Sequence, residues 1–205
     1  MGQQGRYGKY GEHKRMERLL RGKAPGTGRP GRGGFFRPGR WALERKEPAP
    51  DSGLSARPAG RADAEHVHAM SRMFRAYGPY QDILREWHES GAAIAFIGLR
   101  DNRPAGFAMM GRISAAWHFP RVAELLAIAV EPSSRRRGLA GLMLQEVEET
   151  AAALGAERLI LHTGVDNVAA RTLFLTHGFT VLDTCRAFYP EGQDALCMIK
   201  DLGHA

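Results

Sequence analysis

Hydrophobic and polar residues along this chain follow two spacings, and each predicts a different kind of element. Apolar runs of strand length, bounded by Gly, Pro, Asn or Asp, recur between residues 53 and 202. Other stretches place apolar residues three or four positions apart, which is the spacing of one helix face. We therefore expect strands at 53–59, 92–100, 105–113, 121–130, 157–164, 179–188 and 194–202. We expect helices at 63–78, 79–90, 136–154 and 166–178.

The order of these elements limits the fold class. Two of the apolar runs are joined by the turn signal DNRP at 101–104, which is typical of an antiparallel hairpin. Helices alternate with the later strands. This order indicates an α/β or α+β domain with a mixed sheet.

Residues 1–52 show neither spacing except at 12–20, where a short helix could form but would be marginal in isolation. Residues 1–50 are rich in Gly, Arg and Pro and hold 13 Lys or Arg against 4 Asp or Glu, whereas residues 51–205 hold 16 basic and 18 acidic residues. Because so little apolar surface is present to offset the ordering entropy, we expect a disordered basic tail at 1–52 and one domain at 53–205. Aromatic residues stand among the arginines at 35–41, so the tail is either a solvated extension or a contact for RNA or a ribosome.

Composition excludes several classes of function. Hydrophobic residues make up 43% of the chain, yet no apolar run has the length of a membrane span. Cys185 and Cys197 are too few for a disulfide framework or a zinc site. The sequence therefore predicts a cytoplasmic protein that contacts no membrane and holds no metal.

The stretch AVEPSSRRRGLAGLMLQEVEE at 129–149 carries the main chemical signal. Arg135, Arg136 and Arg137 stand directly before Gly138, at the start of a predicted helix. The first N–H groups of a helix lack intrahelical partners and lie at the positive end of its dipole, so an unobstructed helix start binds anions. The stretch therefore predicts a pyrophosphate site, although the sequence has neither of the phosphate motifs G-x-x-x-x-G-K-[ST] and G-x-G-x-x-G.

The same stretch resembles a known family. Arg135-Arg136-Arg137-Gly138-Leu139-Ala140 matches the acetyl-coenzyme A signature [RQ]-x-x-G-x-[GA] of the GCN5-related N-acetyltransferase (GNAT) superfamily. DNVAARTLFLTHGF at 166–179 resembles a second motif of that family. RAFYPEGQDALCMI at 186–199 is similar to the subgroup that acetylates the N-terminal alanine of ribosomal proteins. The resemblance covers about residues 53–202 and implies a mixed, mostly antiparallel seven-stranded sheet flanked by four helices.

The resemblance also implies where acetyl-CoA binds. In the family, two central strands splay apart and the pantetheine arm lies in the gap. The backbone of Ile128 and Val130 would bind this arm, and the N–H of Ile128 would face the thioester oxygen. Asn167 would contact the arm or simply cap its helix. The implied cofactor-binding residues are Ile128, Ala129, Val130, Arg135, Arg136, Arg137, Gly138, Leu139, Ala140, Asn167 and Phe174.

Acetyl transfer also requires proton transfer, because amines are protonated at neutral pH. Glu124, a lone carboxylate in an apolar strand, is our first candidate for the general base; the alternative is a glutamate that faces water or pairs with an arginine. His162 would relay protons or belong to the core. Phe174 stands where the family often has a proton-donating Tyr, so Tyr189 or water would protonate the leaving thiolate.

These features predict an acetyl-CoA-dependent N-acetyltransferase in which a primary amine attacks the thioester directly. The expected acceptor is a protein or peptide N-terminus, a lysine or a small amine, and Tyr77, Tyr80 and Trp87 either line its pocket or belong to the core. Because Phe174 has no proton to donate, the alternative is a catalytically weak acetyl-CoA-binding or nucleic-acid-tethered regulatory module. Transfer of a longer acyl group is a third interpretation.

Overall fold

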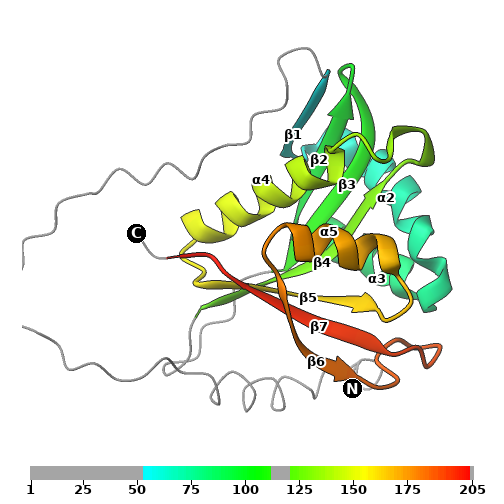
Figure 1. Cartoon of the computed structure of the whole chain (residues 1–205). Coiled ribbons are helices and arrows are strands. Elements are labelled where there is room, and N and C mark those ends of the chain that lie inside the picture. Colours follow the sequence, from blue (N-terminus) through cyan, green and yellow to red (C-terminus); the bar gives the residue numbers. More distant parts are fainter. Residues whose placement is uncertain (1–52, 112–120, 204–205) are drawn as a thin grey trace, which may run out of the picture. The chain divides into compact units, whose positions relative to one another are not determined.

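The computed structural model describes residues 53–111 and 121–203. In them the chain forms a seven-stranded sheet in the order β1-β2-β3-β4-β5-β7-β6 (Figure 1). Its strands are β1 (Leu54–Pro58), β2 (Ala93–Arg100), β3 (Arg103–Gly111), β4 (Val122–Val130), β5 (Arg158–Gly164), β6 (Thr180–Cys185) and β7 (Ala195–Asp201). Among these strands only β4 and β5 run parallel. The mixed, mostly antiparallel sheet that the resemblance implied is confirmed.

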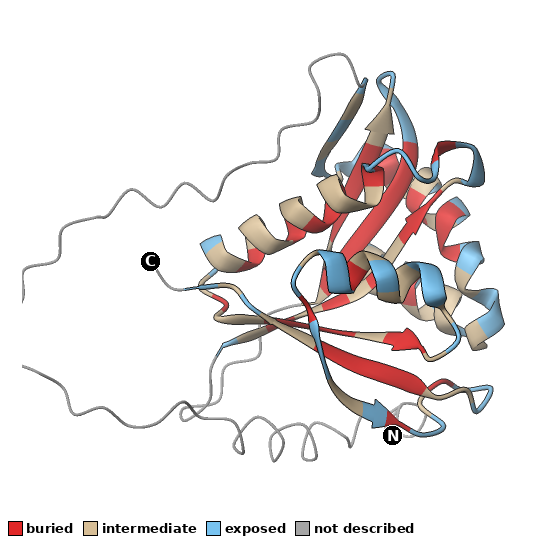
Figure 2. Cartoon of the chain, viewed as in Figure 1, coloured by how far each residue is buried: buried red, intermediate tan, exposed pale blue. Residues whose placement is uncertain are grey.

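Four α-helices of the described residues cover the two faces of this sheet. They are α2 (Ala64–Ser71), α3 (Tyr80–Glu89), α4 (Leu139–Ala153) and α5 (Val168–Thr176). Buried residues of α2 and α3 pack on one face, and those of α4 and α5 pack on the other (Figure 1). The central strands between the two helical layers are the most deeply buried part of the described chain (Figure 2).

Several element boundaries differ from the predicted ones. The helix expected at 63–78 is α2 followed by the 3-10 helix η3 (Arg72–Tyr77), and at their junction the Ser71 hydroxyl donates to the His68 carbonyl at 2.8 Å. The helix expected to begin at 136 begins at Leu139, because Arg136 and Gly138 have φ angles of 58° and 93°, outside the helical range.

Other predicted segments are shorter than expected or lie outside the described residues. The strand expected at 179–188 ends at Cys185, and residues 186–194 form the loop between β6 and β7. The tail expected at 1–52 and the end of the strand expected at 105–113 lie outside the described residues.

A bulge in β4 changes which face of the sheet its side chains occupy. The register with β3 pairs Met110 with Leu125 and then Met109 with Ala127, so Leu126 is an extra residue. Before the bulge, Leu125 packs in the core on the α4 side; after it, Ala127 packs in the core on the α2 and α3 side. The bulge therefore redirects the second half of β4.

The strands β4 and β5 pair only over their first halves. Their parallel register covers 122–125 and 158–161, although β4 continues to Val130 and β5 to Gly164. The last paired residue of β4, Leu125, directly precedes the bulge. The sheet therefore parts between two adjacent strands near its centre.

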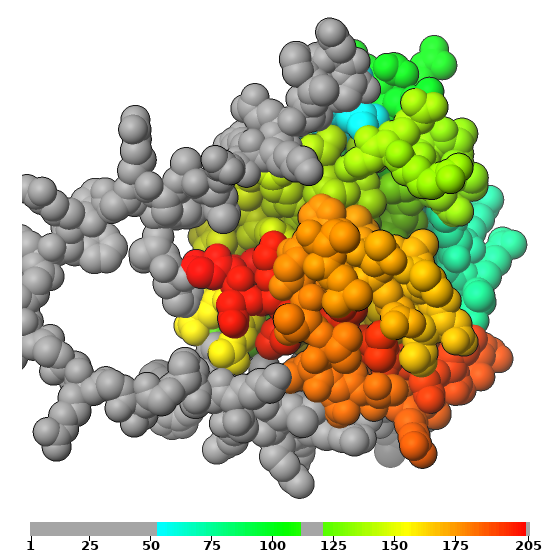
Figure 3. Space-filling model, viewed as in Figure 1, coloured from blue at the N-terminus to red at the C-terminus, as the bar shows by residue number. Residues whose placement is uncertain are grey.

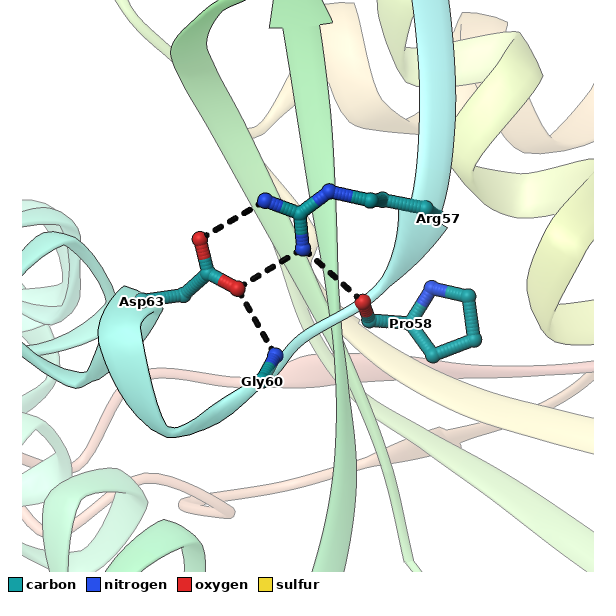
Figure 4. A network of polar contacts seen from close by, with 4 residues as sticks. All are labelled: Arg57, Pro58, Gly60 and Asp63. Carbon is teal, nitrogen blue, oxygen red and sulfur yellow. Dashed lines mark hydrogen bonds and ion pairs between the residues drawn. The ribbon is translucent and has the colours of Figure 1, made fainter.

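A charged network ties the edge strand β1 to the start of α2 (Figure 4). The Arg57 guanidinium donates to both carboxylate oxygens of Asp63, at 2.7 and 2.9 Å, and the Gly60 N–H donates to the same carboxylate at 2.7 Å. The hydrogen bonds from Arg57, supported by the one from Gly60, hold the pKa of the buried Asp63 below its usual value. This network fixes the entry into the helical layer that carries α2 and η3.

Candidate active site

A cleft lies where β4 and β5 part. Segments from both strands, from α5, from η3 and α3, and from the β6–β7 loop surround it. Its lining residues are Phe74, Tyr77, Tyr80, Leu125, Leu126, Ala127, Ile128, Leu161, His162, Thr163, Asn167, Ala170, Phe174 and Tyr189. Five of the predicted site residues are therefore gathered here: Ile128, His162, Asn167, Phe174 and Tyr189.

The open edge of β4 forms one wall of the cleft. The Glu131 N–H donates to the Ala105 carbonyl at 2.8 Å, so the backbone of Glu131 faces β3. Because strand backbone groups alternate in direction, Ala129 also faces β3, whereas Ile128 and Val130 direct their N–H and C=O groups toward the β5 side. The Val130 carbonyl accepts a hydrogen bond from Arg135 Nε at 3.1 Å. An extended ligand with amide groups would fit against this edge.

The turn before α4 leaves the start of that helix open. Gly138 caps α4 in the left-handed conformation, and its carbonyl accepts the first intrahelical hydrogen bond, from the Leu142 N–H at 3.1 Å. The N–H groups of the residues Leu139, Ala140 and Gly141 therefore have no partner within the helix. A Cβ added to Gly138 would meet no atom within 4 Å, so a side chain there would project into open space.

The three arginines of this turn have different positions. Arg135 is tied to the end of β4 by its bond to Val130, whereas Arg136 and Arg137 extend from exposed positions. The turn before α4 and the surface of α5 lie on the same face of the described molecule (Figure 3). Free backbone N–H groups flanked by guanidinium groups suit an anion such as a pyrophosphate, so the residues present fit the nucleotide end of acetyl-CoA.

Asn167 and Phe174 place α5 beside the cleft. The Asn167 side-chain oxygen accepts from the Ala170 N–H at 3.1 Å, so Asn167 is the N-cap of α5. Phe174 is buried and packs edge-on against Phe179, with ring centroids 5.7 Å apart. The helix therefore offers an apolar ring at the position where the family often has a proton donor.

Glu124 and His162 form a pair at the point where the strands separate. His162 Nδ1 lies 3.2 Å from Glu124 Oε1, and the two side chains are 9% and 25% exposed. Glu124 belongs to the paired part of β4, whereas His162 is the first residue of β5 beyond the pairing. His162 lines the cleft and Glu124 does not. Glu124 would therefore act on a molecule in the cleft only by way of the His162 imidazole.

Aromatic residues form the opposite wall. The Tyr189 ring lies 4.3 Å from that of Tyr77 and 6.2 Å from that of Tyr80. Tyr80 donates its hydroxyl to the carbonyl of the bulge residue Leu126 at 2.9 Å, and Tyr189 donates to the His162 carbonyl at 3.4 Å. Burial raises the pKa of the Tyr189 hydroxyl, and nearby Tyr77 and Glu124 raise it further.

The β6–β7 loop contacts the end of η3 beside these tyrosines. The Gln193 side-chain amide, from the β6–β7 loop, donates to the Ala76 carbonyl in η3. Beside that contact, a Cβ on Gly78 would lie 3.0 Å from the Pro190 Cβ, so the two segments are closely packed. The β6–β7 loop and the end of η3 are therefore joined beside the tyrosines.

Sequence reasoning singled out Glu124 and His162 separately but did not pair them. The pairing depends on the parallel register of β4 and β5, which aligns Glu124 with Ile160 and sets His162 two residues further on the same face. Tyr77 and Tyr80 line the cleft, whereas Trp87 packs against Tyr80 without lining it. Phe74 and Leu126 were missed, because no local pattern marks a bulge or a 3-10 turn.

Two further observations concern the described residues alone. In that part of the chain, no three His, Cys, Asp or Glu side chains gather closely enough to hold a metal ion. Nor does any helix there have the length and apolar character needed to cross a membrane.

Comparison with known proteins adds to this geometry. The model of the acetyltransferase (GNAT) family matches residues 63–179. An N-alpha-acetyltransferase of Saccharolobus solfataricus is 28% identical over 134 residues, which cover 60% of this chain and 78% of that protein.

Solved structures also resemble the chain. The structure of yncA from Salmonella typhimurium with its cofactor acetyl-CoA gives a TM-score of 0.63 at 17% identity, over 75% of this chain and 96% of that one. The ribosomal-protein-S18-alanine N-acetyltransferase from Escherichia coli gives a TM-score of 0.55 at 20% identity, over 74% and 96%. At identities of 17% and 20%, these two matches show a shared fold and no more.

Proposed function

We propose that this chain, which belongs to the acetyltransferase (GNAT) family, acetylates the N-terminal amine of a peptide or protein. Membership supports an acetyl-CoA-dependent N-acetyltransferase and favours that activity over the catalytically weak acetyl-CoA-binding module that Phe174 suggested. The observation that carries the choice of acceptor chemistry is the Glu124–His162 pair, which meets a tyrosine-lined cleft at the parting of β4 and β5.

The proposed donor side consists of the β4 edge at 128–130, where Ile128 lines the cleft, and of the turn at 135–141 that follows it. The backbone of Ile128 and Val130 would hold the pantetheine arm, and Asn167 and Phe174 would flank it from α5. The N–H groups at the start of α4 would hold the pyrophosphate, with Arg136 and Arg137 as charged neighbours. This assignment uses backbone groups for most contacts, and the bound thioester would supply the acetyl group.

The acceptor side consists of Tyr77, Tyr80, Glu124, His162 and Tyr189. His162 receives the proton of the incoming ammonium on Nε2, because its Nδ1 faces Glu124. The freed nitrogen lone pair then forms the C–N bond to the thioester carbon, and the C–S bond breaks with the electron pair leaving on sulfur. The second proton that the nitrogen loses passes through water to that sulfur. The carboxylate of Glu124 stabilises the imidazolium and sets its orientation, as an acidic partner does for histidine bases in general.

The departing thiolate requires a proton of its own. Tyr189 is poorly suited to supply it, because its pKa is raised whereas a thiol has an ordinary pKa near 8.5. Phe174 has none to give. Water that reaches the sulfur is therefore the proposed donor, and Tyr189 keeps a structural role through its bond to the His162 carbonyl.

Two observations favour a chain terminus over a lysine side chain as acceptor. The related protein of Saccharolobus solfataricus is an N-alpha-acetyltransferase. In addition, the hydrogen bond between Gln193 and Ala76 joins the two segments beside the tyrosines, which favours an acceptor that enters end-on over one that must lie across the cleft. A small amine would also enter such a cleft and is therefore included in the test.

The experiment compares three acceptors at equal concentration, with release of free thiol as the readout. The first is a lysine-free peptide with a free N-terminus, the second is an N-terminally blocked peptide with one internal lysine, and the third is a small primary amine. We expect turnover to be fastest with the first, and mass spectrometry to place the acetyl group on its terminal nitrogen. Faster turnover of the lysine peptide or the small amine would assign the acceptor to that other class.

The basic tail suggests a location for this activity. Its excess of Lys and Arg, with aromatic residues among them, suits contact with RNA or a ribosome. We therefore expect deletion of residues 1–50 to abolish salt-sensitive RNA binding while leaving turnover of a short peptide intact. Equal RNA affinity with and without the tail would contradict this part of the proposal.

A further inference from the structure

The ring of Phe188 lies flat against the imidazole of His162. Their centroids are 4.2 Å apart and their planes are inclined by 14°. Phe188 is not among the residues that line the cleft. Phe188 therefore contacts the ring of His162 from outside the lining of the cleft.

We infer that Phe188 is a positioning residue that holds His162 in the orientation needed to accept the proton, an inference that rests on the proposed function. The hydrogen bond to Glu124 fixes which edge of the imidazole faces β4. A single hydrogen bond leaves the plane of the ring free to turn about the bonded nitrogen. The flat contact with Phe188 limits that freedom, because tilting the imidazole out of its plane would push one ring into the other. Together, Glu124 and Phe188 determine the direction of Nε2.

Phe188 itself is held by a well-anchored loop. Tyr189 packs edge-on against it, with centroids 5.1 Å apart and planes at 89°. The preceding residue, Ala187, has a φ of 47° and donates its N–H to Asp194 Oδ1 at 2.7 Å. The Asp194 carbonyl in turn accepts from the Val165 N–H, directly after β5, at 3.2 Å. The loop thus returns to the strand that carries His162, so both rings are fixed to the same part of the sheet.

The test compares Phe188→Leu, which keeps an apolar side chain but removes the flat ring, with Phe188→Tyr, which keeps the ring. We expect Phe188→Leu to lower kcat about five- to tenfold with the KM for acetyl-CoA unchanged, and Phe188→Tyr to stay within about twofold of the parent, in line with the usual strength of aromatic stacking. Arg186→Gln, at an exposed position of the same loop, is the matched control and should leave both constants unchanged. Equal losses in the Leu and Tyr variants would overturn the inference.

Measuring Phe188→Leu in a His162→Gln enzyme tests the positioning role separately from the proposed function. In a His162→Gln enzyme, Phe188→Leu should change the residual kcat less than about twofold, because the residue through which it acts is gone. If Phe188→Leu costs as much there as in the parent, the positioning role is wrong although the function stands. If His162→Gln itself has full activity, the proposed role of His162 is wrong.

A spectroscopic readout needs no variant that might misfold. In the parent protein, the imidazole C–H protons of His162 should resonate upfield of ordinary values, because they lie over the face of Phe188. An ordinary chemical shift for these protons would show that the two rings do not stack in solution and would overturn the inference.

Discussion

The donor side and the acceptor side of the cleft are built from different chemical groups. On the proposed donor side, the groups that would face a ligand are backbone N–H and C=O groups of β4 and of the start of α4. On the acceptor side they would be side chains: a histidine that contacts a carboxylate, and three tyrosines. Backbone groups are present whatever the residue, whereas a carboxylate, an imidazole or a phenol is lost with one substitution. The two sides should therefore respond differently to mutation.

The two sides also differ in how they are held. The donor side is local, since a strand end, a turn and a helix start follow one another within residues 128–141. The acceptor side joins segments that are far apart in the sequence, through contacts such as Glu124 with His162 and Gln193 with Ala76. Changes on the donor side should therefore act on affinity for acetyl-CoA, whereas changes on the acceptor side should act on the rate of transfer.

The largest expected effect is on the acceptor side. Glu124→Gln keeps the shape of the side chain and a hydrogen-bond acceptor for His162 but removes the negative charge that stabilises the imidazolium. We expect kcat to fall about 100-fold, within the usual contribution of general base catalysis, while the dissociation constant of acetyl-CoA stays within about twofold. Single-turnover kinetics and calorimetry separate the two quantities.

Glu65→Gln, an exposed substitution on α2, is the control and should leave both quantities unchanged. If Glu124→Gln weakened acetyl-CoA binding and left kcat intact, the division between the two sides would be wrong.

A smaller effect is expected at Gly138, a donor-side residue whose left-handed backbone conformation favours glycine. Gly138→Ala would place a side chain at φ 93°, where L-residues are strained, and would direct its methyl group into the open space before α4. We expect about tenfold weaker binding of acetyl-CoA, equivalent to about 1.4 kcal/mol, with kcat at saturation little changed.

Gly91→Ala is the matched control for this prediction. Gly91 also has a positive φ, 67°, and a Cβ there would likewise meet no atom within 4 Å. Both variants should lose some thermal stability, but only Gly138→Ala should lose affinity. Equal affinity losses in the two variants would mean that the turn before α4 binds no anion.

The same contrast explains what the sequence could predict. The turn at 135–140 was recognisable because all of its chemistry lies in six consecutive residues, and the strands and helices around it follow regular spacings. The Glu124–His162 pair was not, because it depends on how β4 and β5 align and on where they part. Leu126 illustrates the limit: an apolar residue within an apolar run gives no sign that it is the bulge that redirects β4. Phe188 likewise gives no sign of its contact, which only the folded loop creates.

The smallest expected effect concerns the support of the acceptor side. Asp63→Asn removes the charge that binds Arg57, at the entry into α2 and η3. We expect a loss of about 1 kcal/mol in the free energy of unfolding at pH 7, below the usual range for charge-assisted hydrogen bonds, because Arg57 is half-exposed and therefore screened by solvent. Urea denaturation measures this loss.

The pH dependence of that loss gives the sharper test. The pKa of Asp63 is lowered in the folded protein, so its contribution is fully present above the pKa of the unfolded chain, about 3.9, and is lost as the pH falls through the folded pKa. The difference in unfolding free energy between parent and variant should therefore shrink below about pH 4, and it should be small at every pH in an Arg57→Gln background. A difference that stayed constant with pH would mean that Asp63 contributes through packing or neutral hydrogen bonds. The anchoring of the acceptor side would then not depend on the charge that Figure 4 shows paired with Arg57.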